Sequence, residues 1–380
     1  MKMENSMTDI NISKNREELK NLCIGFCLLA FLFVVIAILE QVLPRTSMIF
    51  TVLKKGAIYA LVAVSMNLLN GFTGLFSLGQ AGFMMIGAYT YGIFTIPVAQ
   101  RAAVYQYFDG GIVQFTLPFA LAIVLAGLAA AFFAFLIGLP VLHLKSDYLA
   151  IATLGFAEIM RAFFQWDKIG VLTNGSNLLR KYTVFKSTLF PFAVSAICIA
   201  VIVLLINSTY GRAFKAIRDD EVAAEAMGIN LAHHKRMAFT ISSFFAGVSG
   251  ALLAMFQTTI QANQFKSAMT YEILLIVVIG GIGSVTGSCI SSFLFIACSE
   301  WWLRFLDNAN AYIGSFHVPL LRPGFRKVVF SVVIMLIVLF YQRGIMGENE
   351  FSIAGVMKFF KSLPAKFAKK QAAASEGGKD

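Results

Sequence analysis

Charged residues are scarce in this 380-residue sequence, at 13% of the chain, whereas 58% of the residues are hydrophobic. Soluble domains carry about 25% charged and about 45–50% apolar residues. The chain therefore has too few charges to cover a water-facing surface, which excludes an ordinary soluble protein. Its apolar residues fall in blocks of about 20, the length of a membrane-crossing helix, and not in the short alternating segments of a β-barrel. An integral membrane protein built from helices is the class that remains.

Cysteine is rare as well, and the residue patterns of metal sites and of catalysis are missing. No Ser-His-Asp arrangement, paired catalytic carboxylates or His-Glu-x-x-His motif occurs, so we expect no catalytic residue and no enzyme. Cys23 and Cys27 share a helix face, but no histidine or carboxylate joins them to complete the four ligands of a zinc site. Buried thiols behave as small hydrophobes, so we expect no disulfide, no metal and no cofactor. The five cysteines all lie in apolar stretches: Cys23, Cys27, Cys198, Cys289 and Cys298.

Ten apolar runs predict an all-α fold, a polytopic bundle of about ten transmembrane helices. The first run is too long for the core of a signal peptide and no cleavage site follows it, so we expect it to remain as a span. The third run is rich in glycine, and the eighth and ninth meet in Gly-Gly-Ile-Gly-Ser-Val-Thr-Gly, so a broken or re-entrant element could replace a full span at either place. The runs are approximately 22–39, 56–70, 72–97, 115–142, 148–164, 188–207, 237–260, 271–283, 285–306 and 325–341.

The basic residues lie at the chain ends and in the loops, and the net charge is +11. This placement fits contact with an anionic membrane leaflet better than a nucleic-acid groove. Lys and Arg recur in the N-terminal segment, in the loop 208–236 after the sixth span and in the tail. Because cytoplasmic loops hold the excess of Lys and Arg, all three segments are expected in the cytoplasm. The expected organisation is a cytoplasmic N-terminal segment (1–21), a membrane domain (22–342) and a basic cytoplasmic tail (343–380).

The loop 208–236 contains the start and stop signals of one short helix, roughly residues 220–227. Asp219 or Asp220 can accept the free N–H groups at the helix start, and Glu221 is favourable beside the positive end of the helix dipole. Gly228 then supplies a left-handed stop. A helix of two turns is too short to be stable alone, so we expect it to dock on something.

The surface of this short helix suits a partner groove. Ala223 and Ala224 are small enough to let another backbone approach, and Val222 and Met227 offer apolar contacts. The capping signals alone are equally compatible with a solvated loop whose helix only links the sixth and seventh spans.

Resemblance to a known family favours the partner groove. Ala223, Ala224 and Gly228 look like the Glu-Ala-Ala-x-x-x-Gly loop of ABC importer permeases, whose short coupling helix sits in a cleft of the ATPase subunit. Val222 stands where that loop has its Glu, which places the chain outside the commonest importer group. Residues 53–341 resemble the branched-chain amino acid ABC transporter permease family, in its LivM-type subunit. The stretches that carry this resemblance are Ser-Leu-Gly-Gln-Ala-Gly-Phe (77–83), Gly-Ala-Tyr (87–89), Asp-Tyr-Leu-Ala-Ile-Ala-Thr-Leu-Gly-Phe (147–156), Gly-Arg-Ala (211–213) and Ile-Gly-Gly-Ile-Gly-Ser (279–284).

The resemblance implies the permease subunit of an ATP-driven importer for branched-chain amino acids in a bacterial inner membrane. Its implied partners are a second homologous permease subunit, two ABC ATPase subunits and an extracytoplasmic substrate-binding protein, with membrane lipid around them. The sequence has no Walker motif, so ATP hydrolysis would belong to the separate ATPases. The implied ATPase-coupling residues are Asp219, Asp220, Glu221, Val222, Ala223, Ala224, Met227 and Gly228.

Two other kinds of function stay open at this point. Urea permeases look similar, so urea or another small polar solute is an alternative substrate. An ion-coupled secondary transporter is a further alternative, but it leaves the short capped helix unexplained. A membrane-embedded enzyme would need a polar catalytic constellation, which the sequence does not contain.

Small and polar residues in two runs are candidates for the translocation path or for helix packing. Small residues let membrane helices approach closely, so packing is the simpler interpretation of the third run. The glycines of the eighth run could be mistaken for a phosphate loop, but no Lys-Ser/Thr follows them, so nucleotide binding is rejected and a break or hinge is expected. The candidates are Gly79, Gln80 and Gly82 in the third run and Gly280, Gly281 and Gly283 in the eighth.

Charges inside the spans are few, and such groups usually face a bundle interior or a water-filled path. Glu158 and Arg161 stand at i,i+3 and can pair on one helix face. Mutual neutralisation is the simpler account of this pair, and a place on the translocation path or at a subunit interface is the alternative. Glu300 and Arg304, near a membrane boundary, are expected to be structural.

Overall fold

The computed structural model describes most of the membrane domain. Of the expected features, the N-terminal segment 1–21, most of the tenth span and most of the basic tail lie outside the described residues. The chain divides into two compact units, Thr46–Asn349 and a second unit made of Met1–Arg45 with Glu350–Asp380, in which the helix Phe33–Val42 is described. The described residues are 30, 33–42, 44, 47–307 apart from 109, 143, 145 and 186, and isolated positions up to 347.

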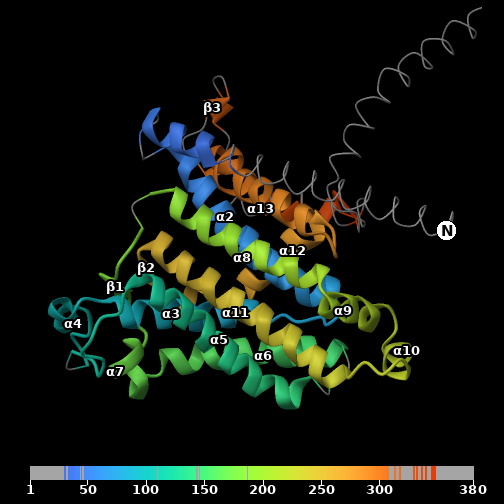
Figure 1. Cartoon of the computed structure of the whole chain (residues 1–380). Coiled ribbons are helices and arrows are strands. Elements are labelled where there is room, and N and C mark those ends of the chain that lie inside the picture. The colour runs from blue at the N-terminus through green and yellow to red at the C-terminus, as the bar shows by residue number, and fades with distance from the viewer. Residues whose placement is uncertain are drawn as a thin grey trace, which may run out of the picture. The chain divides into compact units, whose positions relative to one another are not determined.

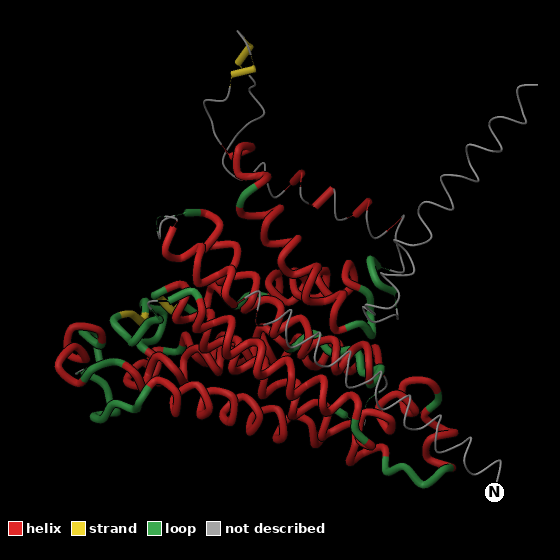
Figure 2. The backbone as a smooth tube through the Cα atoms, turned by 45° about the horizontal axis from the view of Figure 1, so that its top comes forward, coloured by secondary structure: helices red, strands yellow, loops and turns green. Residues whose placement is uncertain are grey.

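Helices make up most of the described part of the unit Thr46–Asn349 (Figure 1), as the sequence predicts, and Figure 2 shows loops mainly where the helices end. The described β structure is two antiparallel pairs, β1 (Leu179–Arg180) with β2 (Thr259–Ile260) and β3 (Tyr312–Ile313) with β4 (Phe316–His317). The α-helices are α2 (Met48–Asn67), α3 (Gln80–Thr95), α4 (Val98–Val104), α5 (Phe119–Val141), α6 (Ser146–Gln165), α7 (Gly170–Thr173), α8 (Leu189–Asn207), α9 (Thr209–Asp219), α10 (Glu221–Ala226), α11 (Leu231–Gln257), α12 (Ser267–Gly280) and α13 (Val285–Glu300). Short π or 3-10 turns are η1 (Leu68–Phe72), η2 (Asp167–Ile169), η3 (Ala262–Gln264) and η4 (Trp302–Asp307).

Four helices of the described part are long and apolar enough to cross a membrane, judged by length and composition. They are α2 with η1 (Met48–Phe72), α5, α8 and α11. The helices α3, α12 and α13 have 16, 14 and 16 residues, fewer than the roughly 20 that span a hydrocarbon core. They contribute to the bundle as shorter pieces.

The centre of the bundle is formed by α2 and α11. In the most apolar window of α11, 78% of the residues are buried, and the corresponding share for α8 is 28%. Helix α11 packs against α2, α3 and α5, and α2 packs against α8, α12 and α13; Figure 1 shows α8, α11 and α5 side by side. A helix that is apolar on all sides and buried belongs to a core. The weakly buried α8 and α5 therefore form the periphery, with side chains such as Leu204 and Phe132 exposed.

Glycines let α3 lie almost in backbone contact with its neighbours. A Cβ added to Gly82 would lie 2.8 Å from Cα of Ala157 in α6, and one added to Gly87 would lie 2.1 Å from the carbonyl oxygen of Gly247 in α11. On the other side of the same contact, a Cβ at Gly250 would lie 1.9 Å from the carbonyl oxygen of Met84. The close approach that the sequence predicts for this run is present.

Two helices of the bundle are interrupted, at the two places where the sequence predicts a broken element. After α2 the chain forms the π-turn η1 and stays non-helical until Gln80, so the predicted start of the third span at residue 72 is wrong by eight residues. Gly74, with φ +74°, leaves the helical conformation there. Between α12 and α13, Gly281 and Gly283 have φ of +113° and +91°.

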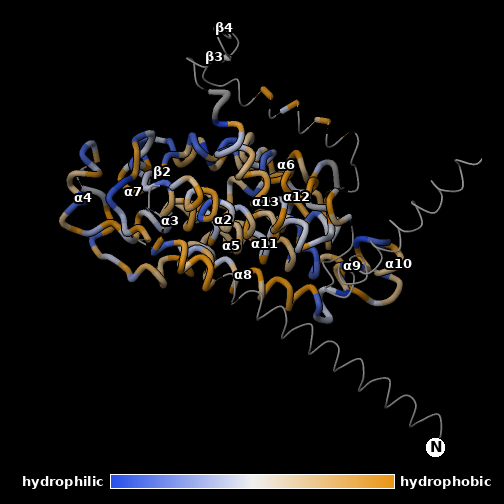
Figure 3. Tube along the Cα trace, turned by 90° about the horizontal axis from the view of Figure 1, so that it is seen from above, coloured by the Kyte–Doolittle hydropathy of each residue, from blue (hydrophilic) through white to orange (hydrophobic). Residues whose placement is uncertain are grey.

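Polar elements gather at two opposite ends of the bundle. Helices α4 and α7 with the β1–β2 pair lie at one end, and α9 with α10 lies at the other (Figure 1). Figure 3 shows hydrophilic segments in both groups and a mainly hydrophobic stretch along α8 between them. We refer to these as the α4 end and the α10 end.

A buried arginine organises the α4 end. The Arg101 side chain is 2% exposed, and its guanidinium donates to four backbone carbonyl oxygens, those of Ile93, Ile96, Val113 and Phe115. The planar fork of an arginine can reach several acceptors at once. Arg101 thereby ties the end of α3 to the loop that leads into α5.

Tyr105 connects this loop to α7. Its hydroxyl donates to the carbonyl oxygen of Leu172 at 2.9 Å. Burial raises the pKa of Tyr105 to about 12, so the hydroxyl keeps the proton that this hydrogen bond needs.

The contact between α3 and α11 can be tested with one methyl group. Gly87→Ala places a Cβ against the carbonyl of Gly247, and overpacking of this kind costs about 1–3 kcal/mol, so the melting temperature of the purified protein should fall. The matched control is Gly155→Ala in α6, where an added Cβ meets nothing within 4 Å and the more rigid alanine should be neutral or stabilising. Equal melting temperatures for the two variants would contradict this packing.

Candidate functional site

The α10 end is built on an amphipathic helix that the sequence analysis missed. The region 208–236, expected as a loop with one short helix, also contains α9 and the first turns of α11. In α9, Phe214 and Ile217 are fully buried and Tyr210 is half exposed. These three residues stand at i, i+4 and i+7, the spacing of one helix face, so the periodicity of this stretch contained the signal for the helix.

Helix α10 begins and ends where its capping residues predict. The Asp220 carboxylate accepts from the backbone amides of Val222 and Ala223, at 2.8 and 3.0 Å. Gly228 has φ +84°, the left-handed conformation that follows a helix end. Of the two aspartates considered, Asp220 is the cap, and Asp219 accepts instead from the Arg218 guanidinium, at 2.9 and 3.0 Å.

Helix α10 is held to the bundle on one side. Glu221 in its first turn accepts from Nζ of Lys235 in α11 at 2.6 Å, and Ala224 is buried. Exposed ion pairs contribute little, about 0–1 kcal/mol, so the buried Ala224 and the cap fix the position together with this pair. The sequence did not predict Lys235 as the partner of Glu221, because the two residues are 14 positions apart and lie in different helices.

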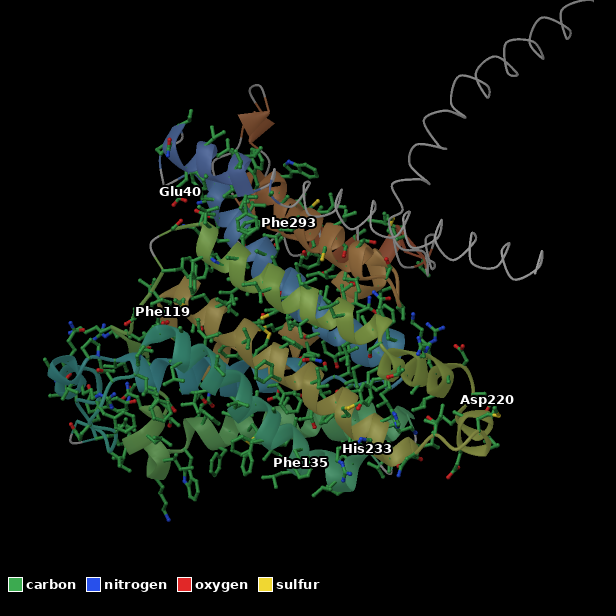
Figure 4. The ribbon with its side chains drawn as sticks, viewed as in Figure 1. Glu40, Phe119, Phe135, Asp220, His233 and Phe293 are labelled. Atoms are coloured by element: carbon green, nitrogen blue, oxygen red, sulfur yellow. The ribbon has the colours of Figure 1, made fainter. Side chains whose placement is uncertain are left out.

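The opposite side of α10 is apolar and open. Val222 is 78% exposed and Met227 is 84% exposed, more than any other large hydrophobic side chain that the structure describes. Ala223 is exposed beside them. Figure 4 shows Asp220 in the segment that projects from the bundle, at the end where His233 lies and away from Phe119. The candidate docking surface is therefore Val222, Ala223 and Met227.

The C-terminal end of α9 packs against the interruption between α2 and α3. Arg218 Nη1 donates to the carbonyl oxygen of Gly71 at 3.3 Å, and a Cβ on Gly74 would lie 3.1 Å from Cγ of Arg218. Lys215 Nζ lies 5.6 Å from the ring centroid of Phe72, within the range of a cation–π contact. The projecting segment is thus in direct contact with a helix break of the bundle.

Gln80 lies in a polar contact within the bundle. Its Nε2 donates to Oγ of Ser242 in α11 at 2.9 Å, and that hydroxyl donates to the carbonyl oxygen of Ser65. Gln80 is 1% exposed, and its Oε1 has no hydrogen-bond partner among the described residues. Gly79 lies beside Thr153 of α6: a Cβ added to Gly79 would lie 3.2 Å from the carbonyl oxygen of Thr153.

Glu158 and Arg161 form the ion pair that their spacing predicts. Arg161 Nε donates to Oε2 of Glu158 at 2.7 Å, and the other carboxylate oxygen accepts from the backbone amide of Ser267 at the start of α12. The two side chains are 36% and 24% exposed. This pair thus joins α6 to α12.

Glu300 pairs with Lys55 of α2 at 2.5 Å, a contact between helices that local spacing does not reveal.

The predicted site residues therefore fall into separate groups. The α10 residues project from one end, Gly281 and Gly283 lie in the α12–α13 break, and Gln80 and Glu158 belong to different hydrogen-bonded groups. Among the described residues, no group of three or more His, Cys, Asp or Glu side chains could hold a metal ion.

Comparison with known proteins gives one family. The sequence model described as "Branched-chain amino acid transport system / permease component" matches residues 48–339. The chain is 31% identical over 300 residues to the high-affinity branched-chain amino acid transport system permease protein LivM of Salmonella typhimurium, covering 70% of this chain and 67% of that protein. It is 30% identical to LivM of Escherichia coli with the same coverage, and 23% identical over 329 residues to LivH of Escherichia coli, covering 82% of this chain and 98% of LivH. No solved structure matches the chain.

Removal of the α10 cap should loosen this helix specifically. Asp220→Ala leaves the amides of Val222 and Ala223 without their acceptor, and loss of such a cap costs about 1 kcal/mol. Amide hydrogen exchange in residues 221–227 should therefore become roughly fivefold faster, and Asp220→Asn should preserve much of the protection. Asp219→Ala is the matched control and should leave these amides unchanged. Equal exchange in the two alanine variants would show that Asp220 does not stabilise α10.

Proposed function

Because the chain belongs to the family of permease components of branched-chain amino acid transport systems, we propose that it is the membrane-spanning permease subunit of an ATP-driven importer for branched-chain amino acids. The names of its relatives LivM and LivH support this substrate class. Substrate reaches the permease from an extracytoplasmic binding protein, and the chain itself hydrolyses no ATP.

The observation that carries the proposal is helix α10. It is a capped helix at one end of the bundle whose outer side presents Val222 and Met227 to solvent. Neighbouring exposed apolar side chains at the end of a projecting helix suit burial against a protein partner. The sequence contains no Walker motif, so a separate ATPase must supply the energy, and α10 is the surface on which it docks. Asp219, Asp220, Glu221 and Gly228 shape that surface, and Ala224 anchors it.

The α10 end is assigned to the cytoplasm. Arg212, Lys215 and Arg218 lie in α9, and Lys235 and Arg236 lie in the first turns of α11, in keeping with the excess of basic residues in cytoplasmic loops. The α4 end is then extracytoplasmic and is where the binding protein docks. Ten crossings with both termini in the cytoplasm agree with this orientation.

The complete importer contains this chain, a second homologous permease, two ABC ATPases and the binding protein, in a bacterial inner membrane. The existence of two related permease proteins, LivM and LivH, among the relatives supports a pair of permeases. The weakly buried, apolar α5 and α8 suit contact with lipid.

A charge on the exposed side of α10 should prevent ATPase docking. In the double variant Val222→Glu, Met227→Glu, two carboxylates would have to be desolvated in the partner groove. Recovery of the ATPase subunits with the purified permease should fall at least tenfold, and uptake should fall with it. The conservative pair Val222→Ile, Met227→Leu should retain both, and Tyr107→Glu, an equally exposed residue at the α4 end, should retain the recovery of the ATPase subunits. Normal ATPase recovery with the double Glu variant would remove α10 from the coupling role.

Substrate class and energy source can be tested in one uptake assay. Proteoliposomes that contain the full complex should take up labelled leucine only with ATP on the ATPase side. Excess isoleucine or valine should compete, excess urea should not, and collapse of ion gradients should leave the rate unchanged. Competition by urea would favour the solute alternative, and uptake without ATP would favour a secondary transporter.

A further inference from the structure

Two helix interruptions meet beside the C-terminal end of α9. One is the segment 68–79 between α2 and α3, and the other is the loop 281–284 between α12 and α13. A helix interruption leaves backbone donors and acceptors without intrahelical partners, which is costly in an apolar environment. The amide of Gly281 still donates to the carbonyl oxygen of Val277 in α12, and one side chain of α2 supplies further partners for the 281–284 loop.

Asn67 is that side chain. Its Nδ2 donates to the carbonyl oxygen of Ser284 at 2.9 Å and to Oγ of Ser288 at 2.8 Å, and it also lies 3.4 Å from the carbonyl oxygen of Gly281. Its Oδ1 accepts from the backbone amide of Gly283 at 2.8 Å. Asn67 is 0% exposed. An amide supplies both a donor and an acceptor at this place, which neither a carboxylate nor an apolar side chain of similar size can do.

The two interruptions are packed together as tightly as their backbones allow. A Cβ added to Gly71 would lie 2.0 Å from Oδ1 of Asn67 and 2.5 Å from the backbone nitrogen of Gly283. Any side chain at Gly71 would therefore push the α12–α13 loop away from α2. The two breaks cannot move independently without loss of the Asn67 hydrogen bonds.

Arg218 places the C-terminal end of α9 beside the same two interruptions. Its Nη1 donates to the carbonyl oxygen of Gly71 and lies 3.5 Å from the Cβ position of Gly283. Arg218 is two residues before Asp220, the cap of α10. We define Asn67, Gly71, Arg218 and Gly283 as the break junction.

The start of the basic tail (343–380) reaches the same loop. The amides of Ile345 and Met346 donate to the carbonyl oxygens of Ile279 and Gly280, at 2.8 and 3.1 Å. These are the last carbonyls of α12, which lack partners within that helix. The end of α12 is therefore held from two sides, by Asn67 and by this turn.

We propose that Asn67 and Arg218 are positioning residues that join the α10 segment to both helix breaks, so that a displacement of α10 by its ATPase shifts the α2–α3 and α12–α13 breaks together. This inference rests on the proposed coupling role of α10. Its physical basis is that helices are stiff while breaks with glycine at positive φ can change conformation, and that Asn67 forces the two breaks to change as one. Arg218 supplies the hydrogen bond by which α9 acts on them.

The test compares transport with ATP consumption in the complete importer reconstituted in proteoliposomes. Arg218→Ala removes the contact to Gly71 while the cap and exposed side of α10 stay in place. The ATPases should still co-purify and hydrolyse ATP within twofold of the unmodified rate, while leucine imported per ATP hydrolysed falls at least tenfold. Arg212→Ala, an exposed arginine near the start of the same helix, is the matched control and should keep the original ratio.

A second variant tests the other half of the junction. Asn67→Asp keeps the acceptor for Gly283 but loses the donor to Ser284, and it should lower the same ratio. If this buried variant fails to fold, Arg218→Ala still decides the question. An unchanged ratio in Arg218→Ala, or a proportional loss of hydrolysis and uptake, overturns the proposal. Persistent ATPase binding by the Val222→Glu, Met227→Glu variant instead rejects the coupling role of α10 on which it rests.

Discussion

Backbone hydrogen bonding inside an apolar bundle is the constraint on which the rest of this structure depends. Every amide and carbonyl at membrane depth needs a partner in the protein, and the flanking helices supply partners for only part of the segment 73–79 and the loop 281–284. Polar side chains on neighbouring helices supply the partners. Thr153 accepts from the amide of Leu78, Thr270 accepts from that of Ala81, and Asn67 serves the loop. Irregular backbone is thereby fixed in place by three different helices.

Small residues do two things in the same bundle. Gly87 brings the backbones of α3 and α11 together, and serines of α11 donate to backbone carbonyls of its other neighbour, α2. Ser242 donates to the carbonyl oxygen of Ser65, and Ser249 donates to that of Ile58, both from α11 to α2. Hydrogen bonds of this type add roughly 0.6–2 kcal/mol each in membrane helices. Close backbone contact and these hydrogen bonds thus both contribute to the core.

The sequence was sufficient for features that depend on neighbouring residues. Apolar runs predicted the helices, Asp220 and Gly228 predicted the limits of α10, and the spacing of Glu158 and Arg161 predicted their ion pair. The glycine-rich runs predicted both breaks. These features follow from propensity, capping and helix periodicity, which act within a few residues.

Features that depend on distant parts of the chain could not be predicted from the sequence. Asn67 and Ser284 are 217 positions apart, and Lys55 and Glu300 are 245 apart. Their partners are set by how helices pack, which no local pattern encodes. An isolated polar residue such as Asn67 in an apolar run does signal a buried contact, because its burial is costly without one, but it does not name the partner. For the same reason Arg218 looked like one basic loop residue among several.

Arg101 has a consequence for how the α4 end meets other molecules. Its guanidinium holds carbonyl groups from the end of α3 and from the loop before α5 in one arrangement. Loops that become ordered only on association lose conformational entropy at that moment, which weakens a complex. A loop already ordered by a buried guanidinium loses little. A protein that docks at the α4 end therefore encounters a surface that is already ordered. Its affinity is then determined mainly by the contacts it makes, because little conformational entropy is lost on binding.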